Sequence, residues 1–162
     1  MDACHGRKVI DRTLIDRRQP TLRTVLNPRR QNSLGLELCM GCICEATSNC
    51  NLTFHCTRGF CGPFLISQLY WKEAGRPVIP GDHQNKKGAY IRCVTEPYCA
   101  AATVRHYLAR YAQDCNGNGN IDCDDFARIH YMGGRQCTIS MENLGYYQVF
   151  GACHKSIRQL TG

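Results

Sequence analysis

The most regular chemical spacing in the chain lies between Asp114 and Asp125. Counted from Asp114, side chains that carry oxygen occupy positions 1, 3, 5, 9 and 12, which are Asp114, Asn116, Asn118, Asp122 and Asp125. Gly119 stands at position 6, Ile121 at position 8, and Asn120 at position 7 would offer its backbone carbonyl. Oxygen ligands at this spacing around a glycine are typical of an EF-hand calcium loop. The segment is therefore a candidate site for structural calcium.

Two features of the same segment favour a simpler interpretation. Position 12 is an aspartate, whereas EF-hands use the longer glutamate to bind calcium through both oxygens. Cys115 and Cys123 also lie in the segment and can tether it through disulfide bonds. Asparagine and glycine are common in ordinary turns. A polar turn between two helices is thus the alternative to calcium binding.

Cysteine is the second residue type whose number indicates chemistry. The chain has 13 cysteines, and all except Cys4 fall between Cys39 and Cys153. This density in a small domain is typical of secreted proteins that are held by disulfide bonds. The remaining even number predicts six bridges and leaves Cys4 as a free or intermolecular thiol. The spacing of Cys39 and Cys42 also suits zinc, but no second Cys-x-x-Cys or His-x-x-x-His pair completes a tetrahedral site.

Positive charge is concentrated at the N-terminus. The formal net charge is +7, and residues 1–37 supply +4 of it, from eight Lys/Arg against four Asp/Glu. We expect a poorly ordered basic tail over residues 1–37 and one domain over residues 38–162. The tail lacks the uninterrupted apolar run of a signal peptide, so we expect an incomplete or atypical start for an exported protein. A basic surface favours anionic partners, but there is no recognisable nucleic-acid module and no membrane-spanning run.

The elements that must position these residues are mainly helical. Apolar residues at helical spacing predict helices over residues 37–48, 97–113 and 124–131. Residues 61–67 are predicted to form a strand or turn that leads into residues 68–71. Residues 75–88 read as a loop rich in proline, glycine and lysine.

Several segments of this domain resemble the invertebrate-type lysozymes, the family that includes destabilase. The segments are Cys39-Met-Gly-Cys-Ile-Cys-Glu-Ala-Thr-Ser-Asn-Cys50, Cys61-Gly-Pro-Phe-Leu-Ile-Ser67, Tyr70-Trp-Lys-Glu-Ala-Gly-Arg-Pro77, Tyr98-Cys-Ala-Ala-Ala-Thr-Val104, Tyr107-Leu-Ala-Arg-Tyr-Ala-Gln-Asp-Cys-Asn-Gly117 and Asp125-Phe-Ala-Arg-Ile-His130. The resemblance runs from about Leu38 to Cys153. It implies an α+β, mainly helical, disulfide-rich lysozyme-like fold with a short β-hairpin and a cleft, in a secreted protein. It also implies hydrolysis of the β-1,4 glycosidic bond of bacterial peptidoglycan, and for some members isopeptidase activity.

The carboxylates that this hydrolysis needs are missing at the positions where the family carries them. A glycosidase of this kind pairs a carboxylic acid that protonates the leaving oxygen with a second carboxylate. The two matching positions here are Thr47 and Gly59, which offer no acid. Glu45 is a weak substitute, because two positions along a helix turn its side chain by roughly 200° from Thr47. The sequence therefore predicts weak or lost muramidase activity.

A different catalytic pair is the basis of the isopeptidase hypothesis. Ser67 and His130 both lie in segments of the resemblance, and a serine becomes a nucleophile when a histidine base is within hydrogen-bond reach. No Gly-x-Ser-x-Gly elbow surrounds the serine. A hydrogen-bonded packing role for the histidine stays open.

Aromatic residues offer a third function, which is glycan binding without cleavage. Sugar faces stack on aromatic rings, and Tyr70, Trp71, Tyr131, Tyr146 and Tyr147 lie near the relevant segments. We assign substrate binding to Tyr70, Tyr131, Gly133 and Gly134, although each aromatic residue can equally belong to the core. The expected partner is peptidoglycan or a related N-acetylglucosamine glycan, with no required cofactor.

One further segment is consistent with an exported protein. Asn51-Leu-Thr53 is an acceptor sequence for N-glycosylation, with Asn51 as the modified residue. A sugar at this position would lie close to the expected cleft. A protein that neither cleaves nor binds glycans, and that works through its basic surface, remains the alternative.

Overall fold

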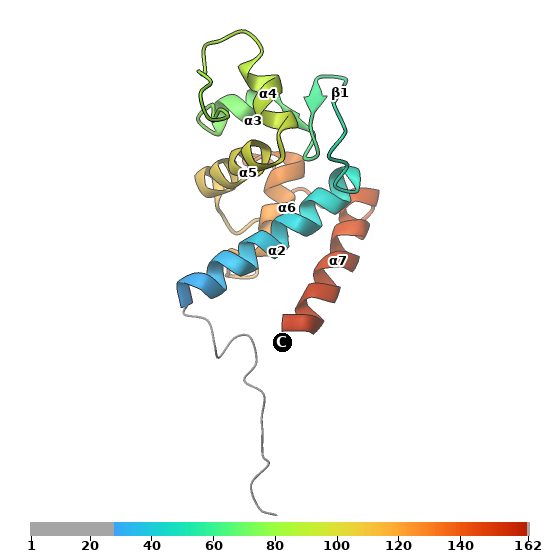
Figure 1. The fold of residues 1–162 in the computed structure, drawn as a ribbon. Coiled ribbons are helices and arrows are strands. Elements are labelled where there is room, and N and C mark those ends of the chain that lie inside the picture. The colour runs from blue at the N-terminus through green and yellow to red at the C-terminus, as the bar shows by residue number, and fades with distance from the viewer. Residues whose placement is uncertain (1–27, 162) are drawn as a thin grey trace, which may run out of the picture.

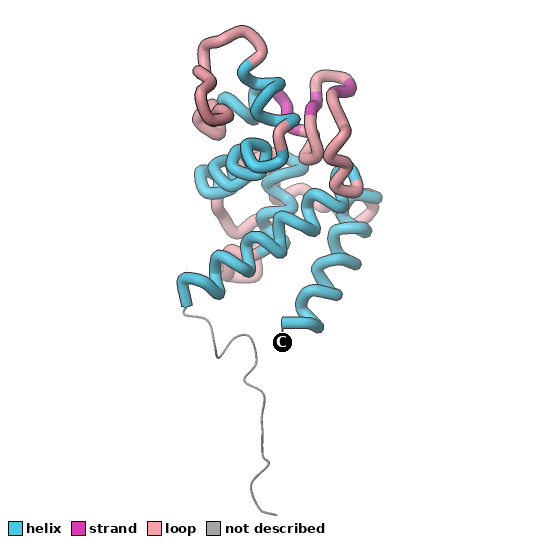
Figure 2. Tube along the Cα trace, viewed as in Figure 1, coloured by secondary structure: helices cyan, strands magenta, loops and turns pink. Residues whose placement is uncertain are grey.

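The computed structural model describes residues 28–161, which form six helices and a small sheet; Figures 1 and 2 show their arrangement. The helices are α2 (Pro28–Ser48), α3 (Gln68–Glu73), α4 (Ala89–Thr95), α5 (Pro97–Tyr111), α6 (Cys123–Met132) and α7 (Gly145–Thr161). The strands are β1 (Cys56–Thr57), β2 (Phe60–Cys61) and β3 (Ile66–Ser67). This is the α+β, mainly helical fold with a short hairpin that the sequence predicts. Cys4 and the rest of residues 1–27 lie outside the described residues.

The first helix is longer than expected. α2 begins at Pro28, so residues 28–37, which we assigned to a poorly ordered tail, are helical, and the boundary at residue 38 falls inside the helix. Proline suits the first turn of a helix, because its missing N–H has no partner there in any case. Further along α2, Cys39, Cys42 and Ile43 are buried at helical spacing. The helix therefore starts ten residues before the expected boundary of the domain.

The other two predicted helices are confirmed, and both begin at side-chain caps. Glu96 accepts hydrogen bonds from the backbone N–H groups of Tyr98 and Cys99, and Pro97 occupies the first turn of α5. Asp122 caps α6 in a reciprocal capping box with Asp125. Such caps satisfy backbone donors that have no partner within the helix. They fix where each helix starts.

The small sheet is antiparallel in the order β1-β2-β3. Thr57 pairs with Phe60, so Arg58 and Gly59 form the two-residue turn between β1 and β2. Both turn residues have positive φ, at 47° and 86°. Two-residue hairpin turns of this kind match the twist of the strands, and glycine adopts positive φ without strain. Figure 1 shows this hairpin beside the C-terminal end of α2.

Six disulfide bonds hold the described fold together, as the cysteine count predicts. They are Cys39–Cys123, Cys42–Cys153, Cys44–Cys50, Cys56–Cys61, Cys93–Cys99 and Cys115–Cys137. The first two join α2 to α6 and to α7 across 84 and 111 residues of sequence. A bridge of this kind typically contributes ~2–4 kcal/mol, mainly by restricting the unfolded chain. α2 is thus the central element to which the later helices are attached.

Candidate functional site

Thr47 and Gly59, which the resemblance assigns to the positions of the catalytic carboxylates, lie on the end of α2 and on the hairpin. Thr47 is half-buried in the last turn of α2, and its hydroxyl donates a 2.6 Å hydrogen bond to the Ile43 carbonyl. Its neighbour Ser48 donates to the Pro63 carbonyl at 2.5 Å, which ties the helix to the segment after β2. The Thr47 hydroxyl therefore serves its own helix, and its proton is not acidic at neutral pH.

Gly59 leaves the second position without a side chain. It is exposed, and a Cβ added there would meet no atom within 4 Å. The Tyr90 hydroxyl lies 3.4 Å from the Gly59 carbonyl and 2.6 Å from the Ile66 carbonyl, and so holds the hairpin turn against α4. The turn is present and supported, but position 59 offers no carboxylate.

No hydrogen bond or ion pair of the described residues joins a nearby acidic side chain to Thr47 or Gly59. Glu45 is exposed on α2, while Cys44 before it is buried. Both carboxylate oxygens of Glu96 accept hydrogen bonds from backbone N–H groups at the start of α5. Glu96 is therefore a helix cap, and Glu45 remains only a weak candidate.

Ser67 has a structural contact of its own. Its hydroxyl caps α3 by accepting a 3.1 Å hydrogen bond from the Tyr70 backbone N–H. A serine nucleophile needs a base within hydrogen-bond reach. The hydrogen bonds of His130 go instead to Tyr70 and Phe64. The pairing of Ser67 with His130 thus has no support from these contacts and stays a prediction.

Both ring nitrogens of His130 form hydrogen bonds within the fold. Nε2 lies 3.1 Å from the Phe64 carbonyl, which only accepts, so Nε2 carries the proton. In the neutral ring Nδ1 then accepts from the Tyr70 hydroxyl at 3.1 Å. Burial lowers the pKa of His130 to about 4, although the hydrogen bond to Phe64 acts in the opposite direction. The imidazole is a neutral packing group at neutral pH.

Two of the predicted substrate-binding residues, Tyr70 and Tyr131, differ in their exposure to solvent. Tyr70 stacks on Tyr107 with ring centroids 3.6 Å apart, and burial raises the pKa of its hydroxyl well above the usual range. Tyr131 is 50% exposed and stacks on Tyr146 at 4.5 Å. Tyr131 is available to a ligand, whereas Tyr70 belongs to the packing around His130.

Gly133 and Gly134 close the end of α6. Gly133 is the C-cap and has a φ of 83°. Gly134 is buried, and a Cβ there would lie 2.2 Å from Cγ of Tyr111. The Gly134 backbone N–H donates to the Tyr107 hydroxyl at 3.3 Å. The close approach to Tyr111 accounts for glycine at position 134 without a substrate.

Other aromatic residues of the sequence analysis have packing roles. Trp71 is 3% exposed, and its indole N–H donates to the Pro77 carbonyl at 2.7 Å. The Tyr146 hydroxyl donates to the Ala127 carbonyl at 3.1 Å. Tyr107, which stacks on Tyr70 and accepts from the Gly134 N–H, has no functional role predicted from the sequence. Its contacts depend on the tertiary fold, so the local sequence gave no signal for them.

The segment Asp114–Asp125 is organised by hydrogen bonds from its own backbone. The Asp114 carboxylate accepts from the N–H groups of Gly117, Asn118 and Gly119. The buried Asp125 carboxylate accepts from Cys115, Asn116 and Asp122. Side-chain oxygens of Asn116 and Asn118 accept from N–H groups two residues further on, at Asn118 and Asn120.

These contacts favour the turn interpretation, and calcium binding stays a prediction. Over residues 28–161 there is no group of three or more His, Cys, Asp or Glu side chains arranged to hold a metal. The Asn and backbone oxygens of the loop are of the kind that calcium accepts. Asn51, the predicted glycosylation site, is exposed, and its side-chain oxygen accepts from the Thr53 N–H and hydroxyl at 3.0 and 2.8 Å.

The fold and its disulfide bonds define a small lysozyme-like domain, and comparison with known proteins gives the family. The Destabilase family matches residues 36–153, so the chain belongs to it. Invertebrate-type lysozyme 6 of Caenorhabditis elegans is 34% identical over 113 residues, which cover 67% of this chain and 80% of that protein. A lysozyme of Meretrix lusoria is 32% identical over 122 residues, covering 72% of this chain and 90% of that protein.

A solved structure supports the same assignment. A chain in the crystal structure of Aeromonas hydrophila PliI in complex with Meretrix lusoria lysozyme is similar, with a TM-score of 0.57 and 30% identity. The similarity covers 74% of this chain and 93% of that chain. None of the helices in the described part of the chain is long and apolar enough to cross a membrane.

Proposed function

We propose that this protein binds peptidoglycan, or a related N-acetylglucosamine glycan, and cleaves it weakly or not at all. Membership of the family supports a lysozyme-like function. The binding face would be formed by the end of α2 and the β1–β2 hairpin, which carry Thr47 and Gly59. Secretion and an antibacterial or digestive role accompany this proposal, since disulfide-rich domains persist in oxidising compartments.

The observation that carries the proposal is the chemistry of these two positions. The Thr47 hydroxyl is hydrogen-bonded within α2, and Gly59 has no side chain. Without a general acid, glycoside cleavage typically slows by ~10²–10⁴-fold. The second carboxylate, which would stabilise the developing positive charge on the sugar, is also missing. Two such losses are expected to remove most of the turnover.

Glycan binding needs less than catalysis does. Phe60 follows Gly59 directly in the hairpin and is 48% exposed. Exposed aromatic rings offer stacking surfaces to sugars. The disulfide Cys56–Cys61 and the Tyr90 hydroxyl both hold the hairpin in place. A fixed hairpin with an exposed aromatic residue supports glycan binding even without the catalytic carboxylates.

The test measures binding and cleavage on one peptidoglycan preparation. We expect the purified protein to sediment with insoluble peptidoglycan and to release few reducing ends. The double variant Thr47→Glu/Gly59→Asp should raise the release of reducing ends. Its matched control, Thr47→Gln/Gly59→Asn, has nearly the same shape but no acid. Asp and Asn are also among the non-glycine residues that best tolerate the positive φ at position 59.

Two results would contradict the proposal. Rapid release of reducing ends by the unmodified protein would show that other groups supply the acid pair. Failure to sediment with peptidoglycan or chitin would remove the binding function and favour an interaction protein without a glycan ligand. An equal gain in the Gln/Asn control would show that the two carboxylates are not what raises activity.

A further inference from the structure

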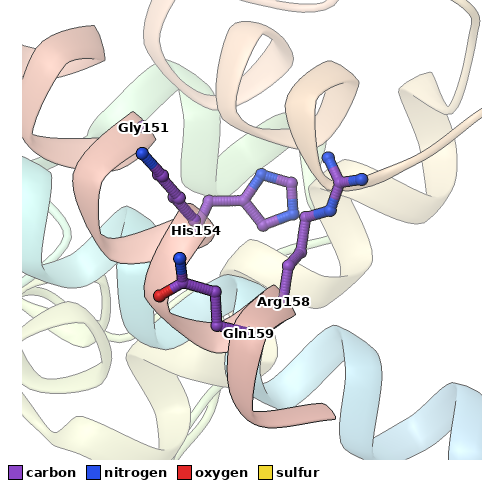
Figure 3. A pocket seen from close by; sticks show the side chains of 5 residues that line it. Gly151, His154, Arg158 and Gln159 are labelled. Atoms are coloured by element: carbon purple, nitrogen blue, oxygen red, sulfur yellow. The ribbon is translucent and has the colours of Figure 1, made fainter. Parts of the chain in front are cut away.

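A hollow on the C-terminal half of α7 lies away from the proposed glycan-binding face. It has a volume of about 400 Å³ and is lined by Gly151, His154, Lys155, Arg158 and Gln159 (Figure 3). This volume falls at the low end of the range for small-molecule sites. In Figure 1 the C-terminal end of α7 is far from the β1–β2 hairpin. The hollow is therefore separate from the positions of Thr47 and Gly59.

The side chains around the hollow are donors. Lys155 and Arg158 carry full positive charges, and Gln159 offers an amide N–H₂ group. No ion pair of either cation appears among the salt bridges of the described residues. Figure 3 shows the Arg158 side chain extending beside the His154 ring. Two cations without an acidic partner in the described part of the chain, next to an open hollow, form an electropositive site.

His154 adds a polar wall to the same site. Its ring stacks on Phe150 at 5.4 Å, which fixes its orientation. Burial and the neighbouring Arg158 both lower its pKa, while Asp122 and Asp124 act in the opposite direction. Asp124 is itself paired with Arg128 at 2.8 Å, so its charge is largely balanced. Lys155 and Arg158 outnumber Asp122, the remaining acidic neighbour of His154, so the excess charge at the hollow is positive.

Gly151 accounts for the open space. It lies within α7, where a glycine costs roughly 0.5–1 kcal/mol relative to alanine. A Cβ added at this position would meet no atom within 4 Å, so packing does not require a glycine. The absence of a side chain leaves the floor of the hollow free. Lys155 and Arg158 near the C-terminus of α7 also interact favourably with the helix dipole. That interaction does not explain why a hollow lies next to them.

We propose that this hollow binds a phosphate group, carried by a small soluble anion or by a glycerol-phosphate headgroup. Arginine and lysine side chains bind phosphate through charge-assisted hydrogen bonds, and Arg158 can do so through two N–H groups at once. The His154 ring and the Gln159 amide supply further donors. His154, Lys155, Arg158 and Gln159 lie beyond residues 36–153, the part that matches the family. All of the proposed phosphate donors thus lie outside the part of the chain that matches the family.

The test is a titration of the ¹⁵N-labelled full chain with sodium phosphate, with sodium chloride added to keep the ionic strength constant. We expect saturable amide shifts concentrated in residues 151–159. The double variant Lys155→Gln/Arg158→Gln should weaken binding at least about tenfold, because two charge-assisted contacts are lost. Gly151→Leu should weaken it similarly while the net charge stays the same, because the leucine fills the hollow.

The matched control removes two charges elsewhere. Lys87→Gln/Arg135→Gln has the same net charge as the first double variant, and both residues are exposed. Binding in this control should stay within about twofold of the unmodified protein, since distant exposed charges are screened. Unfolding temperatures of all variants show whether each one is folded. Linear shifts spread over the whole chain, equal loss in the control, or full binding by Gly151→Leu would each overturn the proposal.

A second arm identifies the source of the phosphate. Vesicles of phosphatidylglycerol and of phosphatidylcholine are sedimented with the protein at equal ionic strength. Selective binding to phosphatidylglycerol that is lost in Lys155→Gln/Arg158→Gln indicates a headgroup ligand. Saturable binding of inorganic phosphate without vesicle binding indicates a soluble phosphate compound. Absence of both rejects the site.

Discussion

The Tyr70 hydroxyl donates a hydrogen bond to His130 Nδ1 across 3.1 Å, and this contact joins α3 to α6. The Phe64 carbonyl holds the other ring nitrogen at the same distance. A histidine with both nitrogens bonded inside the fold acts as a structural link. Protonation would turn Nδ1 into a donor, so it could no longer accept the hydrogen bond from the Tyr70 hydroxyl.

Stability should fall in acid because of His130. Burial lowers its folded-state pKa to about 4, below the ordinary value of 6.5. The unfolded chain therefore binds a proton more readily, so the contribution of His130 is complete above about pH 6.5 and is lost as pH falls toward 4. The loss should reach about 3 kcal/mol, as an upper estimate. Urea unfolding at a series of pH values measures it.

The control for this prediction is His130→Gln, which keeps a donor and an acceptor but does not titrate. Comparing the two proteins at each pH cancels the effect of other titrating groups. The difference in their unfolding free energies should shrink from neutral pH to pH 4. A difference that is constant with pH would show that His130 has no lowered pKa.

Ser67→Ala should reduce stability by about 0.5–2 kcal/mol, because it removes the cap of α3. Ser67→Asp should restore much of this loss, since aspartate is also a good cap. Thermal unfolding compares the three proteins. Isopeptidase activity that is present in the unmodified protein and abolished in both variants would instead identify Ser67 as a nucleophile.

Gly134→Ala should destabilise the fold by about 1–3 kcal/mol, because its Cβ would overlap the Tyr111 ring. Gly151→Ala is the matched change in open space, and it should leave stability unchanged or raise it by up to about 1 kcal/mol. Denaturant unfolding measures both. If Gly134→Ala instead weakened peptidoglycan binding with no loss of stability, Gly134 would be a binding residue rather than a packing residue.

Asp125→Asn should lower stability by about 1–3 kcal/mol, because the buried carboxylate accepts three backbone hydrogen bonds. We expect the same loss in EDTA and in calcium chloride, since these bonds need no metal. A rise in the unfolding temperature of the unmodified protein with calcium, absent with Asp114→Asn, would establish the calcium site.

The three predicted helices were recognisable because their apolar residues recur at helical spacing. α3, α4 and α7 were not predicted as helices, for physical reasons. α3 has only six residues, too few for helical spacing to repeat. α4 consists of Ala-Tyr-Ile-Arg-Cys-Val-Thr, in which aromatic and β-branched residues favour strands. α7 contains two glycines and three aromatic residues, and its helix is stabilised by packing on α2 and by the bridge Cys42–Cys153.

The candidate site also has parts that the sequence predicts and parts that it does not. The assignment of Thr47 and Gly59 comes from the resemblance to the invertebrate-type lysozymes, whose pattern counts both positions from a preceding cysteine. The role of Ser67 as a cap and the burial of His130 were not readable, because both depend on contacts with residues distant in sequence or on the local backbone. The hollow on α7 was missed because it requires that helix.

The two disulfide bonds that join α2 to α6 and α7 affect how the protein withstands proteolysis. The loop over residues 75–88 is largely exposed and offers a cleavage site. A cut there would leave two fragments, yet Cys39–Cys123 and Cys42–Cys153 each join one fragment to the other. The nicked protein would therefore remain a single covalent molecule, able to keep its shape where digestive enzymes are abundant.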